Sequence, residues 1–549
     1  MANAQRCCLC QFEISREDVV TEESKYGSLR NSPSYSYLYL YTVWEYSFLR
    51  SCHRHCLDMI PRPNPQRLAG IAEAMKYEYI PSSRQMDIRH RKIKSLLSTE
   101  LLAHFAHLES NLPLELWSIV AEYLLPYFAS ANLQRLWSPT PEPSCANISK
   151  PIWCKYVDLE GNKYIAAFSN DPSSDDWELI FQPSGELIVD IFVGGNHFGI
   201  TKLLFSSSHN SPDVDEAEGI WWRKVHVEGR YSSIRGFSDG IKLRHLMNVD
   251  KDITAWSVPK SDNVRFEHLS PSFVTTLPAR MASLDCNCPA IVGYSILWEC
   301  GLVTIHVHRI DEDRFEYEFS PYKSWLHMPV DPGEIITEIW LRRSLIRRER
   351  ALGIKTNTGR VFIAGIYTNH PSNWSLVDRP SQGKIFFDCS ETEMTALAFD
   401  SDKPEPPESP FPTPKPSDGS VPAVIEDFFY SEHDLTGLVR VTPCKFFDKP
   451  GYSGMLFHFS NGHRESVGQV RLDYLCSSID LETSTSWFLG FKRRSDLHPY
   501  VATITTSPCS AELNCEAVLE LSFNGRLEWF WSRHQSYVMY KDQKSIRPL

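Results

Sequence analysis

The chain has 549 residues, too many for one hydrophobic core, and its 56 Lys and Arg against 68 Asp and Glu give a formal net charge of −12. This acidity argues against a surface built as a whole to bind nucleic acid or anionic lipid, so we do not expect a nucleic-acid partner. A composition of 42% apolar and 23% charged residues excludes wholesale disorder.

The N-terminal residues include no apolar segment of the kind found in secretory signals, and no run of about 18 apolar residues occurs. We therefore expect no membrane span and a cytoplasmic or nuclear location, or both. In these compartments the 15 cysteines stay mostly reduced. Clustered cysteines then indicate a metal site sooner than disulfides.

The first cysteines and histidines form two pairs with the same spacing. Cys7 and Cys10 are separated by two residues, and His53 and Cys56 repeat this spacing forty-odd residues later. Residues at i and i+3 on a tight turn can reach one tetrahedral ion, which predicts a zinc-knuckle-like module over 1–80 with a structural Zn²⁺. Three neighbours could replace a ligand: Cys8, Cys52 and His55. Alternatively, all of these residues are ordinary buried thiols beside a surface histidine pair.

Residues 82–137 have the apolar periodicity of helices. The most specific pattern starts at Leu112-Pro113, because a proline suits the first turn of a helix, where its missing N–H is not needed. Glu115 falls at the positive end of the helix dipole. The following apolar residues step by three and four, which predicts a helix over 111–125 with one apolar stripe.

This Leu-Pro-x-Glu-Leu pattern resembles the opening helix of the F-box family, in which the stripe docks on the Skp-type adaptor of a cullin–RING ubiquitin ligase. In that family a separate C-terminal domain captures the substrate. The wider layout is similar to that of F-box-like proteins of filamentous fungi. By position, the resemblance implies adaptor contacts at Leu112, Pro113, Leu116, Val120 and Leu124. The alternative is a core helix that packs against a helix over residues 84–108.

From about residue 145 the pattern changes to short apolar and aromatic runs separated by tight turns, which is typical of hairpins. We predict hairpins over residues 157–164, 237–243, 354–362, 456–463 and 519–527. The expected fold is multidomain and mainly β, with a large antiparallel region built as a propeller, prism or sandwich. Its first domain spans 145–400. Residues 401–420 form a proline-rich linker or loop, and 421–549 form a second β domain or complete the first.

Catalytic motifs are nearly absent, so we predict a binding protein and no enzyme. The string Gly236 to Gly240 matches G-x-S-x-G around Ser238, but its polar approach favours a hairpin turn over a nucleophile elbow. His306 and His308 would share one face of a strand. Since no third ligand accompanies them at a suitable spacing, we interpret them as surface or edge residues.

The layout predicts an F-box-like substrate-recognition protein that docks on a Skp-type adaptor and binds a protein target through its β region. The alternative is a β-rich binding protein without ligase coupling, in which the helix over 111–125 is purely structural. This alternative includes a lectin-like activity, because residues 351–365 resemble a strand pair of jacalin-type β-prism lectins. Carbohydrate is therefore a second ligand class to consider.

Overall fold

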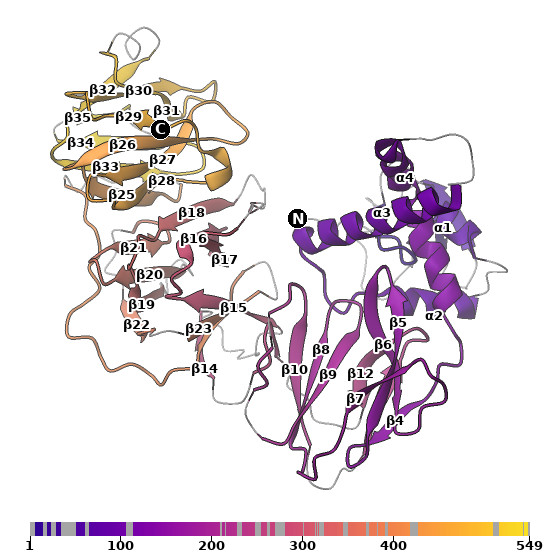
Figure 1. Ribbon diagram of the computed structural model, residues 1–549. Coiled ribbons are helices and arrows are strands. Elements are labelled where there is room, and N and C mark those ends of the chain that lie inside the picture. Colours follow the sequence, from indigo (N-terminus) through magenta and orange to yellow (C-terminus); the bar gives the residue numbers. More distant parts are fainter. Residues whose placement is uncertain are drawn as a thin grey trace. The chain divides into compact units, whose positions relative to one another are not determined.

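The protein is described by a computed structural model (Figure 1). The described residues are 6–14, 19–23, 29–33, 51–60, 65–105, 113–208, 211–214, 216–227, 233–247, 254–260, 264–269, 280–299, 301–312, 315, 317, 323–343, 350–368, 373–380, 383–389, 393–417, 426–508, 515–541 and 543–546. The chain forms two compact units, Met1–Asp262 and Asn263–Leu549. The aromatic residues 35–48, which the sequence suggests as a strand, lie outside the described part.

Unit 1 begins with a small sheet and four helices. Three strands pair antiparallel in the order β2-β1-β3: β1 (Val19–Glu23), β2 (Leu29–Pro33) and β3 (Ser51–His53). The helices are α1 (Arg54–Asp58), α2 (Pro65–Met75), α3 (Ser83–Phe105) and α4 (Leu114–Leu136). Helices α3 and α4 contact each other through the rings of Phe105 and Trp117, which stack with centroids 5.5 Å apart. The Glu122 carboxylate of α4 forms ion pairs with His90 and Lys94 of α3.

The rest of unit 1 is a β-sandwich. Its strands are β4 (Ser144–Asn147), β5 (Ile152–Leu159), β6 (Asn162–Ser169), β7 (Trp177–Phe181), β8 (Asp190–Gly195), β9 (Ile200–Ser206), β10 (Trp221–His226), β11 (Ser233–Ser238), β12 (Leu243–Met247) and β13 (Ala255–Trp256). One sheet has the order β12-β11-β4-β6-β5-β7, and β13-β10-β8-β9 lie in a second. Apolar residues of both sheets, such as Phe168 and Ile191, share one core.

A buried ion pair joins the helices of unit 1 to its sandwich. Glu160 and Gly161 both have positive φ, at 54° and 72°, which is the two-residue turn predicted between β5 and β6. The Glu160 carboxylate receives two hydrogen bonds from Arg89 of α3, at 2.7 and 2.6 Å. The same guanidinium donates to the carbonyl oxygen of Cys10 at 2.8 Å. Arg89 therefore connects the N-terminal loop, α3 and the β5–β6 hairpin.

Arg89→Met is expected to lower the free energy of unfolding of unit 1 by about 3–5 kcal/mol, because the Glu160 carboxylate stays buried without its cation. Urea denaturation of the full chain measures this change. The double variant R89M/E160Q should recover part of the loss. Lys163→Met, which removes an exposed ion pair to Glu178, should leave the unfolding free energy nearly unchanged. Wild-type stability in R89M would contradict the role given to Arg89.

The first part of unit 2 contains three antiparallel groups of strands. Its strands are β14 (Arg265–His268), β15 (Arg280–Cys286), β16 (Ile291–Trp298), β17 (Leu302–Arg309), β18 (Ser324–Pro329), β19 (Ile336–Arg343), β20 (Arg350–Thr356), β21 (Val361–Ala364), β22 (Trp374–Asp378), β23 (Gly383–Asp388) and β24 (Ala396–Phe399). They pair in the orders β14-β24-β23-β15, β17-β16-β18 and β21-β20-β19-β22. Residues of all three groups, including Ile296, Leu341 and Phe387, meet in one core. The same core also includes residues after position 426, such as Phe457 and Trp529.

The second part of unit 2 contains two further sheets. Its elements are β25 (Phe429–Asp434), β26 (Leu438–Lys445), β27 (Tyr452–Phe459), β28 (Arg464–Gly468), η3 (Leu472–Tyr474), β29 (Ile479–Asp480), β30 (Trp487–Arg493), β31 (Pro499–Thr505), β32 (Ala517–Leu521), β33 (Arg526–Trp531), β34 (Ser536–Tyr540) and β35 (Gln543–Lys544). One sheet has the order β25-β33-β34-β35. The other has the order β29-β26-β27-β31-β30-β32, with β28 paired to β27.

Four of the five predicted hairpins are confirmed, and one is wrong. Pairings β5–β6, β11–β12, β20–β21 and β27–β28 fall where expected, and Ser238 ends β11 before the turn at Gly240. The turn at Asn524–Gly525 joins no hairpin, because β32 pairs with β30 whereas β33 pairs with β25 and β34. The chain does turn at Gly525, whose φ is 91°, but it passes there from the sheet that contains β32 to the sheet that contains β33.

The mainly β fold with an N-terminal Cys/His group agrees with the expectation from sequence. The boundary between the two units falls inside the segment 145–400, and the proline-rich residues belong to unit 2. Of the proline-rich residues 401–420, the described ones, 401–417, form neither helix nor strand. Its Phe411 is buried against Trp340 and Trp374, at centroid distances of 5.4 and 4.3 Å.

Candidate metal centre

Two local structures bring the four predicted ligands together. Cys7 and Cys10 lie on a tight turn, closed by hydrogen bonds from Cys7 N to Phe12 O (2.9 Å) and from Gln11 N to Cys7 O (2.8 Å). Gln11 takes the left-handed conformation that this reversal requires, with φ of 60°. His53 ends β3 and directly precedes α1, which holds Cys56 in its first turn.

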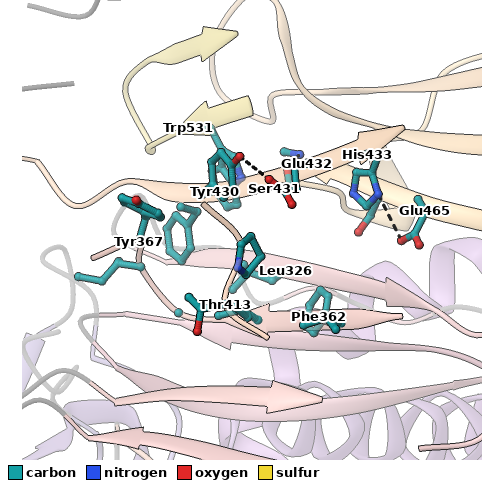
Figure 2. A pocket seen from close by; sticks show the side chains of 18 of the residues that line it. Leu326, Phe362, Tyr367, Thr413, Tyr430, Ser431, Glu432, His433, Glu465 and Trp531 are labelled. Carbon is teal, nitrogen blue, oxygen red and sulfur yellow. Dashed lines mark hydrogen bonds and ion pairs between the residues drawn. The ribbon is translucent and has the colours of Figure 1, made fainter. Parts of the chain in front are cut away.

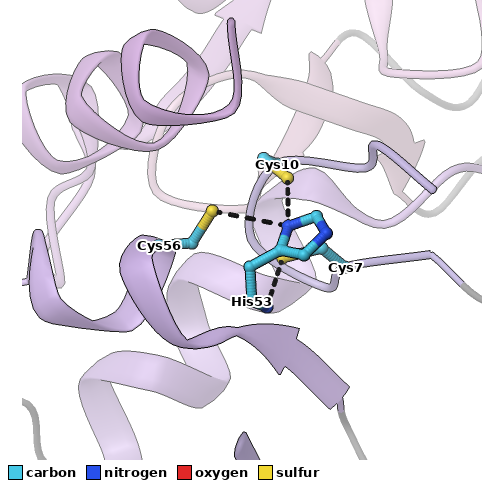
Figure 3. A group of neighbouring side chains, drawn as sticks. All are labelled: Cys7, Cys10, His53 and Cys56. Atoms are coloured by element: carbon cyan, nitrogen blue, oxygen red, sulfur yellow. Dashed lines mark hydrogen bonds between the residues drawn. The ribbon is translucent and has the colours of Figure 1, made fainter. Parts of the chain in front are cut away.

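The donor atoms of Cys7, Cys10, His53 and Cys56 all lie within 4.8 Å of one another, and all four side chains are buried. The Nδ1 atom of His53 is 3.4 Å from the Cys10 sulfur and 3.7 Å from the Cys56 sulfur. A tetrahedral zinc site with ordinary bond lengths places sulfur and nitrogen about 3.6 Å apart. Figure 3 shows the three thiols gathered around the His53 ring. The group can hold a metal ion.

The other nitrogen of His53 fixes the orientation of the ring. Its Nε2 lies 3.2 Å from the carbonyl oxygen of Glu13, so the N–H donates there. In that tautomer Nδ1 carries no proton and its lone pair points at the thiols, which is the arrangement of a metal-ligating histidine held by an outer hydrogen bond.

The thiols cannot all ionise without a cation. Burial raises the pKa of Cys7, but hydrogen bonds from Cys10, Cys56 and His53 outweigh it and bring the pKa well below its ordinary value. Burial raises the pKa of Cys10. Hydrogen bonds with Cys10 and Cys7, together with burial, raise the pKa of Cys56. A bound cation would compensate the charge of all three thiolates, because metal binding requires and stabilises the deprotonated form.

The three alternative ligands lie outside this group of donor atoms. Cys8 is partly exposed, and Cys52 is buried on β3. The ring of His55 stacks on His53 at 4.8 Å and on Tyr127 of α4 at 4.4 Å. Cys56 reaches the same helix, since its sulfur lies 3.8 Å from the carbonyl oxygen of Pro126. The centre therefore has four protein donors, as structural sites do, and the segment that carries His55 and Cys56 contacts α4 at Tyr127 and Pro126.

Helix α4 is apolar on two opposite faces. One face is buried and carries Trp117, Ala121, Leu125, Ala129 and Leu133. The other face, which we call the exposed α4 face, consists of Leu116, Ile119, Val120, Tyr123 and Tyr127. Its side chains are 37–77% exposed, and at about 100° per residue they project opposite the buried set. A helix that is apolar all round is normally covered on both sides.

Two of the five residues implied by the F-box resemblance lie on the exposed α4 face, and none of the described ones belongs to the buried face. Leu116 and Val120 belong to the exposed α4 face, at 44% and 37% exposure. Leu124 is partly buried, and Pro113 directly precedes the first helical residue. Leu112 lies outside the described residues. The helix begins at Leu114 and continues through Pro126 to Leu136, well beyond the predicted end at residue 125.

Unit 2 contains a pocket of about 290 Å³ that the sequence did not indicate (Figure 2). Strand β25 supplies Tyr430, Glu432 and His433 to its wall, β21 supplies Phe362, and β28 supplies Glu465. The hydroxyl of Tyr430 donates to Glu432 at 2.6 Å. Burial raises the pKa of Glu465, but His433 and other nearby cationic groups outweigh it and lower the pKa, so this carboxylate is ionised at neutral pH. The pocket thus combines aromatic rings with carboxylates.

One buried arginine, Arg360, also lines the pocket and binds three carboxylates. Arg360 pairs with Glu334 at 2.8 Å, with Asp331 at 3.0 Å and with Glu465 at 2.7 Å. Burial raises the pKa of Glu334, but the Arg360 guanidinium outweighs it and brings the pKa to about 2. These pairs tie the β20–β21 turn to β28, so the pocket wall is rigidly connected across the two parts of unit 2.

The chain matches no protein-family model and no curated protein. Among solved structures, the crystal structure of a lamprey immune protein aligns with 9% identity and a TM-score of 0.18, covering 52% of this chain and 95% of that one. At this level the likeness carries no argument about fold or function. None of the helices in the part of the chain that the structure describes is both long and apolar enough to cross a membrane.

Cys56→Ser is expected to abolish metal retention at the Cys/His group and to destabilise unit 1 by about 4 kcal/mol or more, the stabilisation given by a ligand at 1,000 times its Kd. Elemental analysis and thermal unfolding of the full chain measure the two effects, and a strong chelator should reproduce the second. Cys8→Ser is the matched control, because Cys8 lies outside the donor group. A metal-free wild-type protein with unchanged unfolding in the chelator would refute the centre.

Proposed function

We propose that this protein is an F-box-like adaptor, in which a zinc-stabilised N-terminal module supports α4 and the exposed α4 face docks on a Skp-type adaptor of a cullin–RING ubiquitin ligase. The β region would then bind the protein target. The observation that carries the proposal is the second apolar face of α4, which unit 1 leaves in contact with solvent.

Zinc is the proposed ion because of the donor set. Three thiols and one imidazole favour Zn²⁺ over Mg²⁺ and Ca²⁺, which take oxygen ligands. The ion would hold the turn at Cys7–Cys10 against α1, and α1 contacts α4 through His55 and Cys56. The zinc module would thus hold α4 in place by a contact at Tyr127, at one end of the exposed α4 face.

The energetics of the exposed α4 face suit a protein partner. Covering a fully exposed large apolar side chain contributes about 1.5–3 kcal/mol before the costs of association, and the five residues of this face, which are 37–77% exposed, would each contribute the corresponding fraction. Leu116 and Val120 are central to this face and are also positions that the F-box resemblance implies. Tyrosines at 123 and 127 are residues of the type that often dominates binding energy.

Leu116→Asp and Val120→Asp are expected to reduce recovery of the Skp-type adaptor at least tenfold (about 1.4 kcal/mol), because each places a carboxylate in an apolar interface. Co-purification of the full chain with the adaptor measures the effect. Leu187→Asp makes the same change at an apolar residue that is 87% exposed in the sandwich unit, and it should leave recovery unchanged. Recovery of the adaptor with all three variants at the wild-type level would contradict the ligase proposal.

The pocket in unit 2 favours a second candidate, a β-rich binding protein with lectin-like activity and no ligase coupling. Aromatic rings such as Tyr430 and Phe362 can stack on the apolar face of a sugar, and Glu432 can accept hydrogen bonds from its hydroxyl groups. In the adaptor proposal the same pocket would instead take a side chain of the protein target.

Tyr430→Ala is expected to weaken glycan binding at least tenfold (about 1.4 kcal/mol) if the second candidate is correct, because it removes an aromatic contact from the pocket wall. A glycan array identifies the ligand, and titration of the best binder measures the loss. Phe447→Ala is the control, since Phe447 is an aromatic residue of unit 2 that is 48% exposed and does not line the pocket. Absence of glycan binding by the wild-type chain would remove this candidate.

A further inference from the structure

A second group of metal-type donors lies in unit 2, where the sequence left two histidines without a third ligand. His306 and His308 lie on β17, and Glu312 follows the strand. The Glu312 carboxylate approaches His306 Nε2 at 2.7 Å and His308 Nδ1 at 3.1 Å. One donor atom from each residue lies within 4.8 Å of the others. The expectation that no third ligand accompanies these histidines is therefore wrong, because the chain turns back after β17 and brings Glu312 to them. Strand β17 lies at the edge of its sheet, as expected, although His308 is buried.

The ring nitrogen of His308 that points away from Glu312 is hydrogen-bonded to a neighbouring side chain, as the second nitrogen of a metal-ligating histidine usually is. Its Nε2 lies 2.8 Å from the hydroxyl of Ser295 on β16, and that hydroxyl lies 3.1 Å from His327 Nδ1 on β18. In the tautomer in which His308 donates from Nε2 to Ser295 and Ser295 donates to His327, the unprotonated Nδ1 of His308 faces the Glu312 carboxylate at 3.1 Å, and a cation between these two lone pairs would satisfy both. Outer hydrogen bonds of this kind fix the tautomer and raise the basicity of a ligating histidine.

The group also has the exposure that a ligand-accepting site needs. The side chains of His306 and Glu312 are each 23% exposed, whereas that of His308 is 4% exposed. An ion bound there would be reachable from solvent yet anchored on the core side. Two imidazoles and one carboxylate are the ligand set of open zinc sites, which keep a position for water or another ligand.

The residues Ser295, His308 and Glu312 also occur in the order of a nucleophile, a base and a carboxylate. Ser295 is fully buried, at 0% exposure, and it is not among the residues that line the pocket. A nucleophile must reach its substrate, so this geometry favours an outer-shell role for Ser295 over catalysis.

A third donor group is less suited to a cation. Glu426, His498 and His534 also converge within 4.8 Å. However, Arg533 donates to the Nε2 of His534 at 2.9 Å, and Arg494 donates to the carbonyl oxygen of the same residue at 2.8 Å. Each group contains one carboxylate, but the two guanidinium groups beside His534 repel a metal ion.

We propose that His306, His308 and Glu312 form a second metal site, which binds a divalent transition-metal ion of the Zn²⁺ type and leaves at least one coordination position open to water or an external ligand. This site is independent of the Cys/His centre in unit 1. It would give the β region a means of ligand recognition that does not depend on the pocket.

The test is a Co²⁺ titration of the full zinc-loaded chain after weakly held metal is removed with a mild chelator. A site with nitrogen and oxygen donors is expected to give cobalt d–d absorption without the thiolate charge-transfer bands of a Cys-rich centre. Glu312→Gln should abolish this absorption and one equivalent of bound metal. Ser295→Ala should weaken binding about 10–100-fold, the effect of losing an outer-shell partner.

Asp311→Asn is the matched control, because Asp311 is an exposed carboxylate next to Glu312 but outside the donor group. It should bind Co²⁺ like the wild type. His306→Gln supplies a second variant in case Glu312→Gln fails to fold. No cobalt binding by the wild type, or equal binding by the wild type and a folded ligand variant, would overturn the proposal. Cobalt spectra dominated by thiolate bands would do the same, because they would assign the ion to the Cys/His centre.

Discussion

The organisation of unit 1 depends on the packing of three thiols and one imidazole into a space that suits one ion. Their two halves are separated by more than forty residues of chain, and closing a loop of that length costs about 3 kcal/mol of conformational entropy. Buried thiolates this close repel one another unless a cation lies between them. Since α1 begins at this group and contacts α4 through His55 and Cys56, the position of α4 depends on it as well.

The buried guanidinium of Arg89 connects the metal centre to the β-sandwich of unit 1. Arg89 binds the backbone of the Cys10 turn and the carboxylate of Glu160 with one guanidinium, which only a planar group with several donors can do. The same core includes Leu57 of α1, Leu133 of α4 and Leu159 of β5. The N-terminal residues therefore pack as part of unit 1, and a change at the metal centre would be felt at the β5–β6 hairpin.

The sequence predicted those features of the fold and of the metal centre that depend on residues close together in the chain. The turn at Glu160–Gly161 follows from the need for positive φ, and the i, i+3 pairs Cys7–Cys10 and His53–Cys56 follow from the reach of a tight turn. The fate of the Asn524–Gly525 turn was not predictable in this way, because the partner of β33 lies far away in the sequence. Glu312 was missed for a related reason, since its place beside His306 depends on how the chain reverses after β17. The sequence shows that the residues of the exposed α4 face are apolar, but it does not show that other parts of unit 1 leave them exposed.

The pairing of β25 with β33 also fixes an order of events during synthesis. Strand β25 ends at Asp434, and its partner begins at Arg526, about 90 residues later. At roughly 5–20 residues per second, β25 waits for several seconds after its synthesis before its hydrogen-bonding edge is covered. During that interval the edge is open to wrong pairing, which is the usual hazard of an unpaired strand. Tyr430 and Glu432 lie on this strand, so a nascent chain that stops before Arg526 would expose an aromatic edge where the complete protein has a pocket.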